Sequence, residues 1–552
     1  MDVDSKLESL GKCGCYQALL FVSLSLIYLR GAWHVFVPVF IAADPGHTCN
    51  LPPKTSGNIN DSYIIPYSNN SGLFDNASYS YVAKASACSV TYYSDTGDNM
   101  SGTCDHGWEY GDQFDSTIVT QFNLVCDDDY KAELSTTIYM IGTAIGAVSL
   151  TYFSDKFGRK KLLIVCLILQ GAIGVGVAFV QSYIFFTILR FFIGLLNMGI
   201  GLTAFVMITE AYPASVRTIP SVAVQIFWAL GIMLLALFGY LVRNWSHLEI
   251  LISAPNFLIV LYIFFIPESI PWLMATNNHQ QANAVMDWAM KINNITHQKH
   301  SHQYHFKNGI KMIPEEEDEG EEENDQSIIN SILRLFRTKK IRLYTIVVIY
   351  LYIVNSLIYM GISFSMPSLH GNIYLNLFLS GLVEIPAQII CMFVITRIGR
   401  RIPLMVFLLL CGISTIGGAV CPVSTDNGTS LVWLKITFFM ISKFAITGSY
   451  STVYLYSAEI FPTVVRNSAM GIASGFENIG SICAPFIMYA SKKIPILPVV
   501  IFSSASIIGC FLIVLLPETN LQPLPQTVSE TYKPRFKDVH AVNRNSHMST
   551  EL

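Results

Sequence analysis

Long apolar segments recur along the whole chain and are separated by shorter polar stretches. A membrane-spanning helix needs about 20 mostly apolar residues. The pattern therefore predicts an all-α membrane protein with twelve transmembrane helices. The predicted spans lie at approximately 16–43, 132–153, 162–180, 183–207, 219–242, 248–266, 342–364, 372–395, 403–421, 431–456, 468–490 and 496–516.

Basic residues orient these spans. The short loops at 155–161, 334–342 and 396–402 are rich in Lys and Arg and fall on one side, which the positive-inside rule makes cytoplasmic. The N-terminus lacks a basic region and a small-residue cleavage site, so we expect no cleavable signal peptide. The expected organisation is a cytoplasmic N-terminus at 1–15, helix 1 at 16–43, an extracellular loop at 44–131, helices 2–6 at 132–266, a cytoplasmic linker at 267–341, helices 7–12 at 342–516 and a cytoplasmic tail at 517–552.

The long loop at 44–131 carries two signs of an oxidising, extracellular environment. It holds four cysteines and four N-x-S sequons, and disulfides and glycans both form on that side of a membrane. Four cysteines allow three pairings, and the sequence does not choose among them. The expected disulfide cysteines are Cys49, Cys88, Cys104 and Cys126, and the expected glycosylation sites are Asn60, Asn69, Asn76 and Asn99.

Composition supports the membrane assignment and limits the function. The 552-residue chain is 52% hydrophobic and only 13% charged, against about 25% charged residues in ordinary soluble proteins. The net charge of −4 owes much to one acidic run at 315–324. We see no catalytic triad, phosphate loop or metal-ligand spacing, so no enzyme activity, cofactor, metal site or nucleic-acid partner is expected. The expected partners are a small organic solute and the lipid bilayer, and the coupling ion is left open.

Three motifs occur twice at nearly constant spacing. ITEAYPASVR and SAEIFPTVVR each contain a Glu and an Arg, and each of these residues recurs 249 residues later in the second motif. PES at 267–269 precedes PET at 517–519 by 250 residues, and the glycines of the hinges DKFGRKK and TRIGRR are 241 residues apart. Such repetition indicates duplication of a six-span unit. Two six-helix halves with a site between them at the bilayer midplane is a transporter architecture.

The repeated motifs all lie on the predicted cytoplasmic face. We expect their charges to pair and to hold the inner ends of the halves together while the outer side is open. The other interpretation is that the cations only set topology and contact lipid headgroups. The candidate gating residues are Asp155, Gly158, Arg159, Lys160, Glu210, Arg217, Glu268, Gly399, Arg400, Arg401, Glu459, Arg466 and Glu518.

Ionisable residues inside membrane spans are costly and usually functional. Arg30, Glu384, Lys443 and Glu477 fall within predicted spans, as does His34. Glu384 and Lys443 either pair with each other or face the substrate. Arg30 either pairs with Glu477 or binds a substrate carboxylate, and His34 is either a packing residue or a ligand.

Five stretches give the chain a resemblance to a known family. They are the long loop with its cysteines, STIVTQFNLVCD at 116–127, SDKFGRKK at 154–161, GNIYLNLFLSGLVEIP at 371–386 and KFAITGSYSTVYLYSAEIFPTVVRN at 443–467. Together they resemble the organic cation, anion and carnitine transporter family of the major facilitator superfamily. The resemblance implies alternating-access transport at the plasma membrane. The chain departs from the family at Pro271, where the family has Arg. It also has Thr396 where a hinge acid is usual, which predicts a weaker inner charge network in the second half.

The resemblance also assigns cavity positions. Glu384 and Lys443 match positions that the family keeps charged. Helix 11 has neutral Asn478 at a position that tends to be acidic in the family's cation transporters and Arg in its anion and carnitine transporters. Two acids and two bases favour an organic cation or a carnitine-like zwitterion as substrate. An organic anion is the alternative, and a non-transporting receptor that uses the extracellular loop is a more distant one. The candidate substrate-binding residues are Arg30, Gln225, Tyr352, Tyr359, Glu384, Lys443, Ser451, Tyr454, Glu477 and Asn478.

Overall fold

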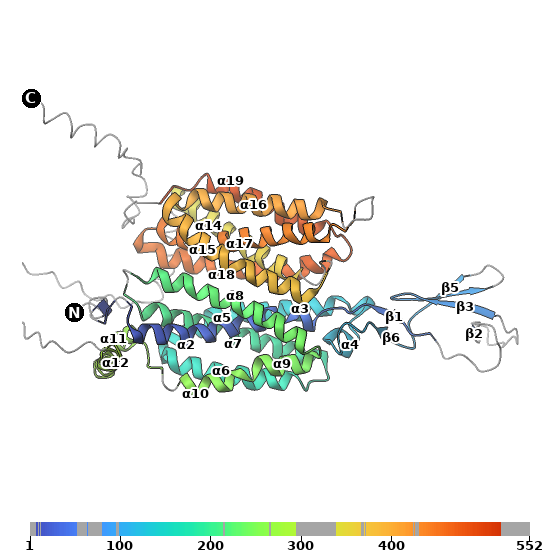
Figure 1. Cartoon of the computed structure of the whole chain (residues 1–552), viewed down its shortest axis with the longest axis horizontal. Coiled ribbons are helices and arrows are strands. Elements are labelled where there is room, and N and C mark those ends of the chain that lie inside the picture. Colours follow the sequence, from blue (N-terminus) through green and yellow to red (C-terminus); the bar gives the residue numbers. More distant parts are fainter. Residues whose placement is uncertain are drawn as a thin grey trace, which may run out of the picture.

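Two bundles of long helices lie side by side, and a β-rich lobe extends from one end of the molecule (Figure 1). This computed structural model describes residues 7–51, 63–64, 80–94, 99–293 and 338–519, apart from short gaps. The gaps are 9, 12, 214–215, 264–265, 366–368, 370, 423 and 425–429. The sequons at Asn60, Asn69 and Asn76, the acidic run at 315–324 and the tail after 519 lie outside the described residues.

The first bundle contains the predicted helices 1–6. Pro38 begins a short continuation of the first helix, and Pro255 begins the second part of the divided sixth span; proline fits best at such helix starts because it lacks a backbone N–H. The helices are α2 (Cys15–Phe36), α3 (Pro38–Ile41), α5 (Tyr130–Phe157), α6 (Arg159–Val177), α7 (Tyr183–Glu210), α8 (Thr218–Leu241), α9 (Trp245–Ser253) and α10 (Pro255–Ile263).

The second bundle contains the predicted helices 7–12. Asn372 caps the second of them, because its side chain accepts hydrogen bonds from the backbone N–H groups of Tyr374 and Leu375. The helices are α14 (Lys339–Phe364), α15 (Ile373–Ile398), α16 (Arg401–Val420), α17 (Val432–Ile460), α18 (Thr463–Ser491) and α19 (Leu497–Ile513).

Eight helical segments among the described residues are long and apolar enough to cross a membrane. They correspond to the predicted spans 1–5 and 7–9. The other four predicted spans are also helical, but the sixth is divided and α19 has only 17 residues. The helical, membrane-type architecture is thus confirmed, whereas the count of twelve spans stays a prediction. Large apolar side chains such as Val148, Phe179 and Val420 are exposed on the bundles, as lipid contact requires.

The two basic hinges have the same backbone geometry. Gly158 ends α5 with φ of 106°, and Gly399 ends α15 with φ of 116°. A Cβ at Gly158 would lie 2.7 Å from a carboxylate oxygen of Glu268, and one at Gly399 would lie 3.0 Å from Glu518. Both hinges therefore need glycine for the backbone angle and for the close approach of a carboxylate.

The two bundles contact each other through α5 with α18 and α8 with α15. At the end nearest the β lobe, the Tyr489 hydroxyl donates a hydrogen bond to Asp129 at 2.9 Å, and Lys492 forms an ion pair with Glu133 at 3.0 Å. We call these two contacts the outer latch. They hold the outer ends of the bundles together in this structure.

The β-rich lobe is held by two small antiparallel sheets and two disulfides. The disulfides are Cys49–Cys104 and Cys88–Cys126, which selects one of the three pairings that the sequence allowed. The first sheet pairs β1 (His47–Cys49) with β6 (Trp108–Tyr110). The second has the order β2 (Tyr63–Ile64), β3 (Ser80–Ala85), β4 (Val90–Ser94), β5 (Asn99–Gly102). The short helices α4 (Ile118–Phe122) and η1 (Cys126–Asp128) lead into α5.

Two short helices follow the first bundle at the end opposite the lobe (Figure 1). They are α11 (Ile270–Ala275) and α12 (His279–Ile292). Asn293, which follows α12, accepts a hydrogen bond from the backbone N–H of Tyr16 and donates one to the carbonyl of Leu10. The linker thus packs against the start of the chain.

Replacing Gly399 with Ala is expected to lower the free energy of unfolding by about 1–3 kcal/mol, because the backbone angle there is one that only glycine adopts readily. Thermal unfolding of the purified protein measures this. Gly176→Ala is the matched control, since that glycine lies in a helix with nothing within 4 Å of the added Cβ. Equal unfolding temperatures for the two variants would contradict the prediction.

Candidate functional site

The repeated charge motifs form one network in each half. In the first half, Arg159 lies 2.9 Å from Asp155 and 3.3 Å from Glu210. Glu268 accepts a hydrogen bond from the backbone N–H of Lys160 at 3.1 Å. The Ser269 hydroxyl also donates to Glu210, so both carboxylates are bound.

The second half repeats this arrangement. Arg400 lies 2.9 Å from Glu459, and Glu518 accepts hydrogen bonds from the backbone N–H groups of Arg400 and Arg401 at 3.0 and 3.1 Å. Thr396 occupies the position of Asp155, and its hydroxyl donates to the carbonyls of its own helix. This second network therefore has a neutral group where the first has a carboxylate.

The remaining motif residues make local contacts. Arg217 and Arg466 each donate from Nε to a carbonyl five residues earlier, both at 3.3 Å. Tyr212, whose carbonyl accepts from Arg217, donates its hydroxyl to the carbonyl of Gln17 at 3.1 Å, and burial raises its pKa to about 12. Pro271 lies in the first turn of α11, where proline is well tolerated.

All of these described motif contacts lie within one half of the molecule. The pairs were expected to hold the inner ends of the two halves together while the outer side is open. Here the outer ends are held together by the outer latch, so that expectation stays a prediction. The hinge glycines bring the N–H groups of each hinge onto the glutamate of the same half, so the networks tie helices of one bundle to each other. The described ion pair between the halves lies at the outer latch.

A buried ion pair lies at the centre of the second bundle. Lys443 Nζ is 2.9 Å from Glu384 Oε1, and the two residues are 0% and 2% exposed. The ammonium also donates to Ser363 Oγ at 2.7 Å and lies 3.3 Å from the ring centroid of Tyr359. Lys443 thus has an anion, a hydroxyl and an aromatic ring as partners.

A hydrogen-bond chain connects this pair to the first bundle. The Tyr359 hydroxyl donates to Glu384 at 2.7 Å and accepts from Trp228 Nε1 at 3.0 Å. Trp228 belongs to α8 of the first half, and Tyr359 belongs to α14 of the second. This contact is a polar link between the halves near the middle of the bundles.

Glu477 has a different environment. Tyr450 and Tyr454 donate hydrogen bonds to its two carboxylate oxygens. The Tyr352 ring lies 4.8 Å from that of Tyr454, and on the side of the first half the Tyr28 ring lies 5.6 Å from that of Trp228. We call Tyr28, Tyr352, Tyr450 and Tyr454 the tyrosine box.

Three further candidates lie around this box. Gln225 donates to the Tyr28 hydroxyl at 3.4 Å, which joins it to the box from the first half. Asn478 donates to the Ser474 carbonyl of its own helix at 3.2 Å. Ser451 donates to Gln388 at 2.7 Å inside the second bundle. Gln225 therefore has a described hydrogen bond to a tyrosine of the box, whereas the described hydrogen bond of Ser451 is to Gln388.

A second buried polar cluster fills the first bundle. Arg30, which is 1% exposed, donates to Gln170. His34 and Arg190 lie 3.6 and 3.8 Å from the fully buried Glu249. The contacts described for Arg30 and Glu477 are thus to different residues in different halves, and no direct pair between them is described.

Several residues of these clusters were missed by the sequence analysis. Arg190 and Glu249 lie inside predicted spans, and a complete count of ionisable residues would have found them. Tyr450 lies one helical turn before Tyr454 on α17, so an i, i+4 pair of tyrosines was visible. Tyr28 and Trp228 had no distinguishing pattern in a chain that is 12% aromatic.

Known proteins resemble this chain along most of its length. The family described as sugar (and other) transporter matches residues 73–529. The human organic cation/carnitine transporter 2 is 32% identical over 543 residues, which cover 96% of this chain and 94% of that protein. Solute carrier family 22 member 2 of Mus musculus is 32% identical, with 96% of each covered, and an organic cation transporter protein of Drosophila melanogaster is 31% identical, with 96% and 94% covered.

Solved structures show the same fold at lower identity. The proton:xylose symporter XylE bound to 6-bromo-6-deoxy-D-glucose has a TM-score of 0.54 at 16% identity and covers 92% of this chain and 98% of that one. A partially occluded, inward-open form of XylE from E. coli has a TM-score of 0.57 at 14% identity, with 91% and 98% covered.

The buried pair generates a stability prediction. Removing one charge, as in Lys443→Met, is expected to cost about 3–5 kcal/mol because Glu384 would be left buried and uncompensated, and adding Glu384→Gln is expected to recover much of that loss. Thermal unfolding of the purified variants tests both. The control is Lys492→Met in the partly exposed outer latch, expected to cost at most about 1 kcal/mol. A double variant as unstable as Lys443→Met would count against the pairing.

Proposed function

The chain belongs to the sugar and other transporter family of the major facilitator superfamily, within solute carrier family 22, and from this premise we propose that it carries small organic cations across the plasma membrane by alternating access. It is a transporter and not an enzyme. Relatives that carry the names organic cation transporter and organic cation/carnitine transporter support this substrate class. The substrate itself is proposed from the charges at the centre of the molecule.

The observation that carries the proposal is the environment of Glu477. Its described hydrogen-bond partners are two neutral phenols, Tyr450 and Tyr454. Glu384 and Lys443 neutralise each other nearby, so an ionised Glu477 would give the central region one excess negative charge. An ammonium group there gains the carboxylate and the faces of the tyrosine box, each aromatic contact contributing about 0.5–2 kcal/mol.

A carnitine-like zwitterion is the second candidate, favoured by the names of the relatives. Its carboxylate needs a cation. Lys443 and Arg30 are the two bases that the sequence analysis offered, and both are at most 1% exposed and already bonded, Lys443 to Glu384 and Arg30 to Gln170. The same burial weighs more heavily against an organic anion, which lacks the ammonium that Glu477 attracts.

The expected topology completes the proposal. We place both termini, the linker and the hinge networks in the cytoplasm, the β lobe outside the cell with glycans on its sequons, and the spans in the lipid bilayer. The hinge networks stiffen each half, and the Trp228–Tyr359 bond and the outer latch join the halves. Rocking of the halves then requires these cross-half contacts to break, and we infer from the closed latch that this conformation is inward-facing.

Uptake in cells that express the chain tests the substrate class. Tetraethylammonium, carnitine and a small aryl carboxylate are compared, each with and without sodium. We expect saturable tetraethylammonium uptake, and we expect Glu477→Gln to lower its kcat/KM about 10- to 100-fold, since a charged interaction is worth about 1.5–3 kcal/mol.

Two further variants make this experiment specific. Glu477→Asp keeps the charge and is expected to retain more uptake than Glu477→Gln, while Asn478→Ser, whose side chain bonds its own helix, is expected to resemble the parent. Carboxylate uptake without any cation uptake would overturn the proposal in favour of an anion carrier. Failure of every solute to exchange, together with ligand binding by the lobe, would favour a receptor.

A further inference from the structure

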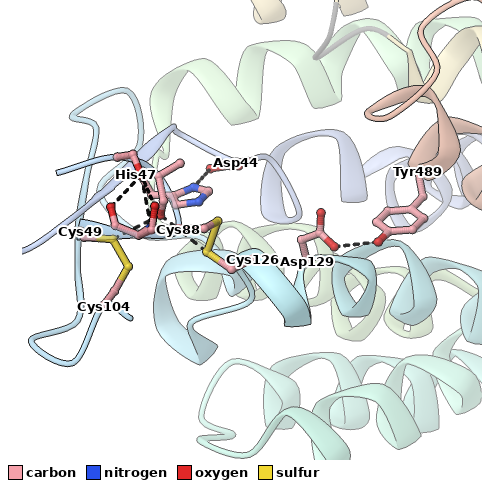
Figure 2. Close-up of a disulfide and its surroundings, with 11 residues drawn as sticks. Asp44, His47, Cys49, Cys88, Cys104, Cys126, Asp129 and Tyr489 are labelled. Carbon is pink, nitrogen blue, oxygen red and sulfur yellow. Dashed lines mark hydrogen bonds and ion pairs between the residues drawn. A yellow bond between two sulfur atoms is a disulfide. The ribbon is translucent and has the colours of Figure 1, made fainter. Parts of the chain in front are cut away.

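An imidazole lies against one of the two disulfides of the extracellular lobe. A ring nitrogen of His47 and the sulfur atoms of Cys88 and Cys126 all lie within 4.8 Å of one another (Figure 2). His47 comes from β1, Cys88 from the turn between β3 and β4, and Cys126 from the first residue of η1. Three segments far apart in sequence thus bring one nitrogen and two sulfur atoms together.

The imidazole is oriented for a ligand. Asp44 Oδ1 lies 3.4 Å from His47 Nδ1, and a carboxylate at that nitrogen favours the tautomer with the proton on Nδ1. Nε2 is then an acceptor, and it is buried with no hydrogen-bond partner among the described residues. A carboxylate behind the far nitrogen is the usual support of a metal-binding histidine. Burial and the negative charge of Asp44 raise the pKa of the adjacent Tyr110, which keeps that phenol neutral.

The disulfide is accessible to an external reductant. Cys88 is exposed, whereas Cys49 of the other disulfide is buried. A dithiol outside the cell therefore reaches Cys88–Cys126 first. One thiolate of the dithiol attacks a sulfur of the Cys88–Cys126 bond, and the second thiol of the dithiol then completes the exchange. The dithiol is thereby oxidised to a disulfide, while Cys88 and Cys126 become thiols.

From this geometry we propose that reduction of Cys88–Cys126 creates a zinc site formed by His47 Nε2, Cys88 Sγ and Cys126 Sγ. Zinc binds thiolate sulfur at about 2.3 Å and imidazole nitrogen at about 2.0–2.1 Å, so the sulfur atoms of a tetrahedral site lie about 3.7 Å apart. Once the covalent bond is open, the two sulfur atoms need only this modest separation. Zn²⁺ displaces the two thiol protons, and water takes the fourth position.

The site has a mechanical role because of where Cys126 lies. Cys126 has a φ of 59°, a left-handed conformation that is unfavourable for a residue with a Cβ. Three residues later, Asp129 accepts the Tyr489 hydrogen bond of the outer latch (Figure 2). The disulfide holds this turn against the lobe, reduction releases it, and zinc binds it again. Thiol reduction and zinc thus control the outer latch in opposite directions.

The test uses the purified full-length chain in detergent with Cys13→Ser and Cys15→Ser, because these exposed free cysteines would otherwise bind metal. The protein is reduced with a phosphine, which is then removed, and titrated with Co²⁺ as a spectroscopic probe for zinc. We expect thiolate-to-cobalt absorption that saturates at one equivalent, that is absent before reduction, and that Zn²⁺ abolishes. His47→Ala is expected to weaken binding more than tenfold, while His106→Ala, an exposed histidine of the same lobe, leaves it unchanged.

Absence of the cobalt–thiolate band after reduction, or equal affinity in His47→Ala, overturns the site. These spectra do not depend on transport, so their failure is distinct from failure of the proposed function. In cells, reduction is expected to change the rate of tetraethylammonium uptake at least twofold, and micromolar Zn²⁺ is expected to restore it in the parent but not in His47→Ala. Cobalt binding with uptake insensitive to both treatments overturns the control of the latch.

Discussion

The cost of leaving a charge unpaired in an apolar interior governs this structure. Lys443 is matched by Glu384, and Arg190 lies near Glu249. Glu477 departs from this rule, because its described hydrogen bonds come from neutral tyrosines. A carboxylate supported by phenols stays hydrated or bound to a transient cation more readily than one that already has a lysine. The same electrostatic constraint that stabilises the bundles is therefore the reason we propose Glu477 as the carboxylate for a substrate.

Pairing within each half also determines how the molecule can move. At each hinge, backbone N–H groups of the glycine turn bind one glutamate, while the hinge arginine pairs with a second glutamate of the same half. Such contacts cannot exchange partners when the halves rock. Among the described residues, polar contacts that join the two halves lie at Trp228–Tyr359 and at the outer latch, and these can break. Motion is thus concentrated where weak polar contacts replace backbone-anchored ones.

The sequence predicted features that follow from local pattern or repetition. Apolar length located the helices, and the repeated motifs identified the paired hinges. Whether the hinge pairs also hold the inner ends together when the outer side opens stays a prediction, because the described contacts belong to one conformation with a closed outer latch. Pairing of Glu384 with Lys443 was one of two alternatives that the sequence offered, and the structure has that pair, whereas the tyrosines around Glu477 were only partly found. Their grouping depends on how α2, α14, α17 and α18 pack, and no spacing along one helix contains that information.

The extracellular lobe is coupled to this motion by its attachment point. A lobe joined only through a flexible loop would leave the bundles free to rock. Here a covalent bond reaches Cys126, and the turn through Asp129 leads directly into α5, which packs against α18 of the other half. Any displacement of α5 at its outer end must therefore move the lobe or deform the turn. Since Cys126 is held in an unfavourable backbone conformation, the turn is the weaker element, and the bond at Cys88 determines how freely the outer side opens.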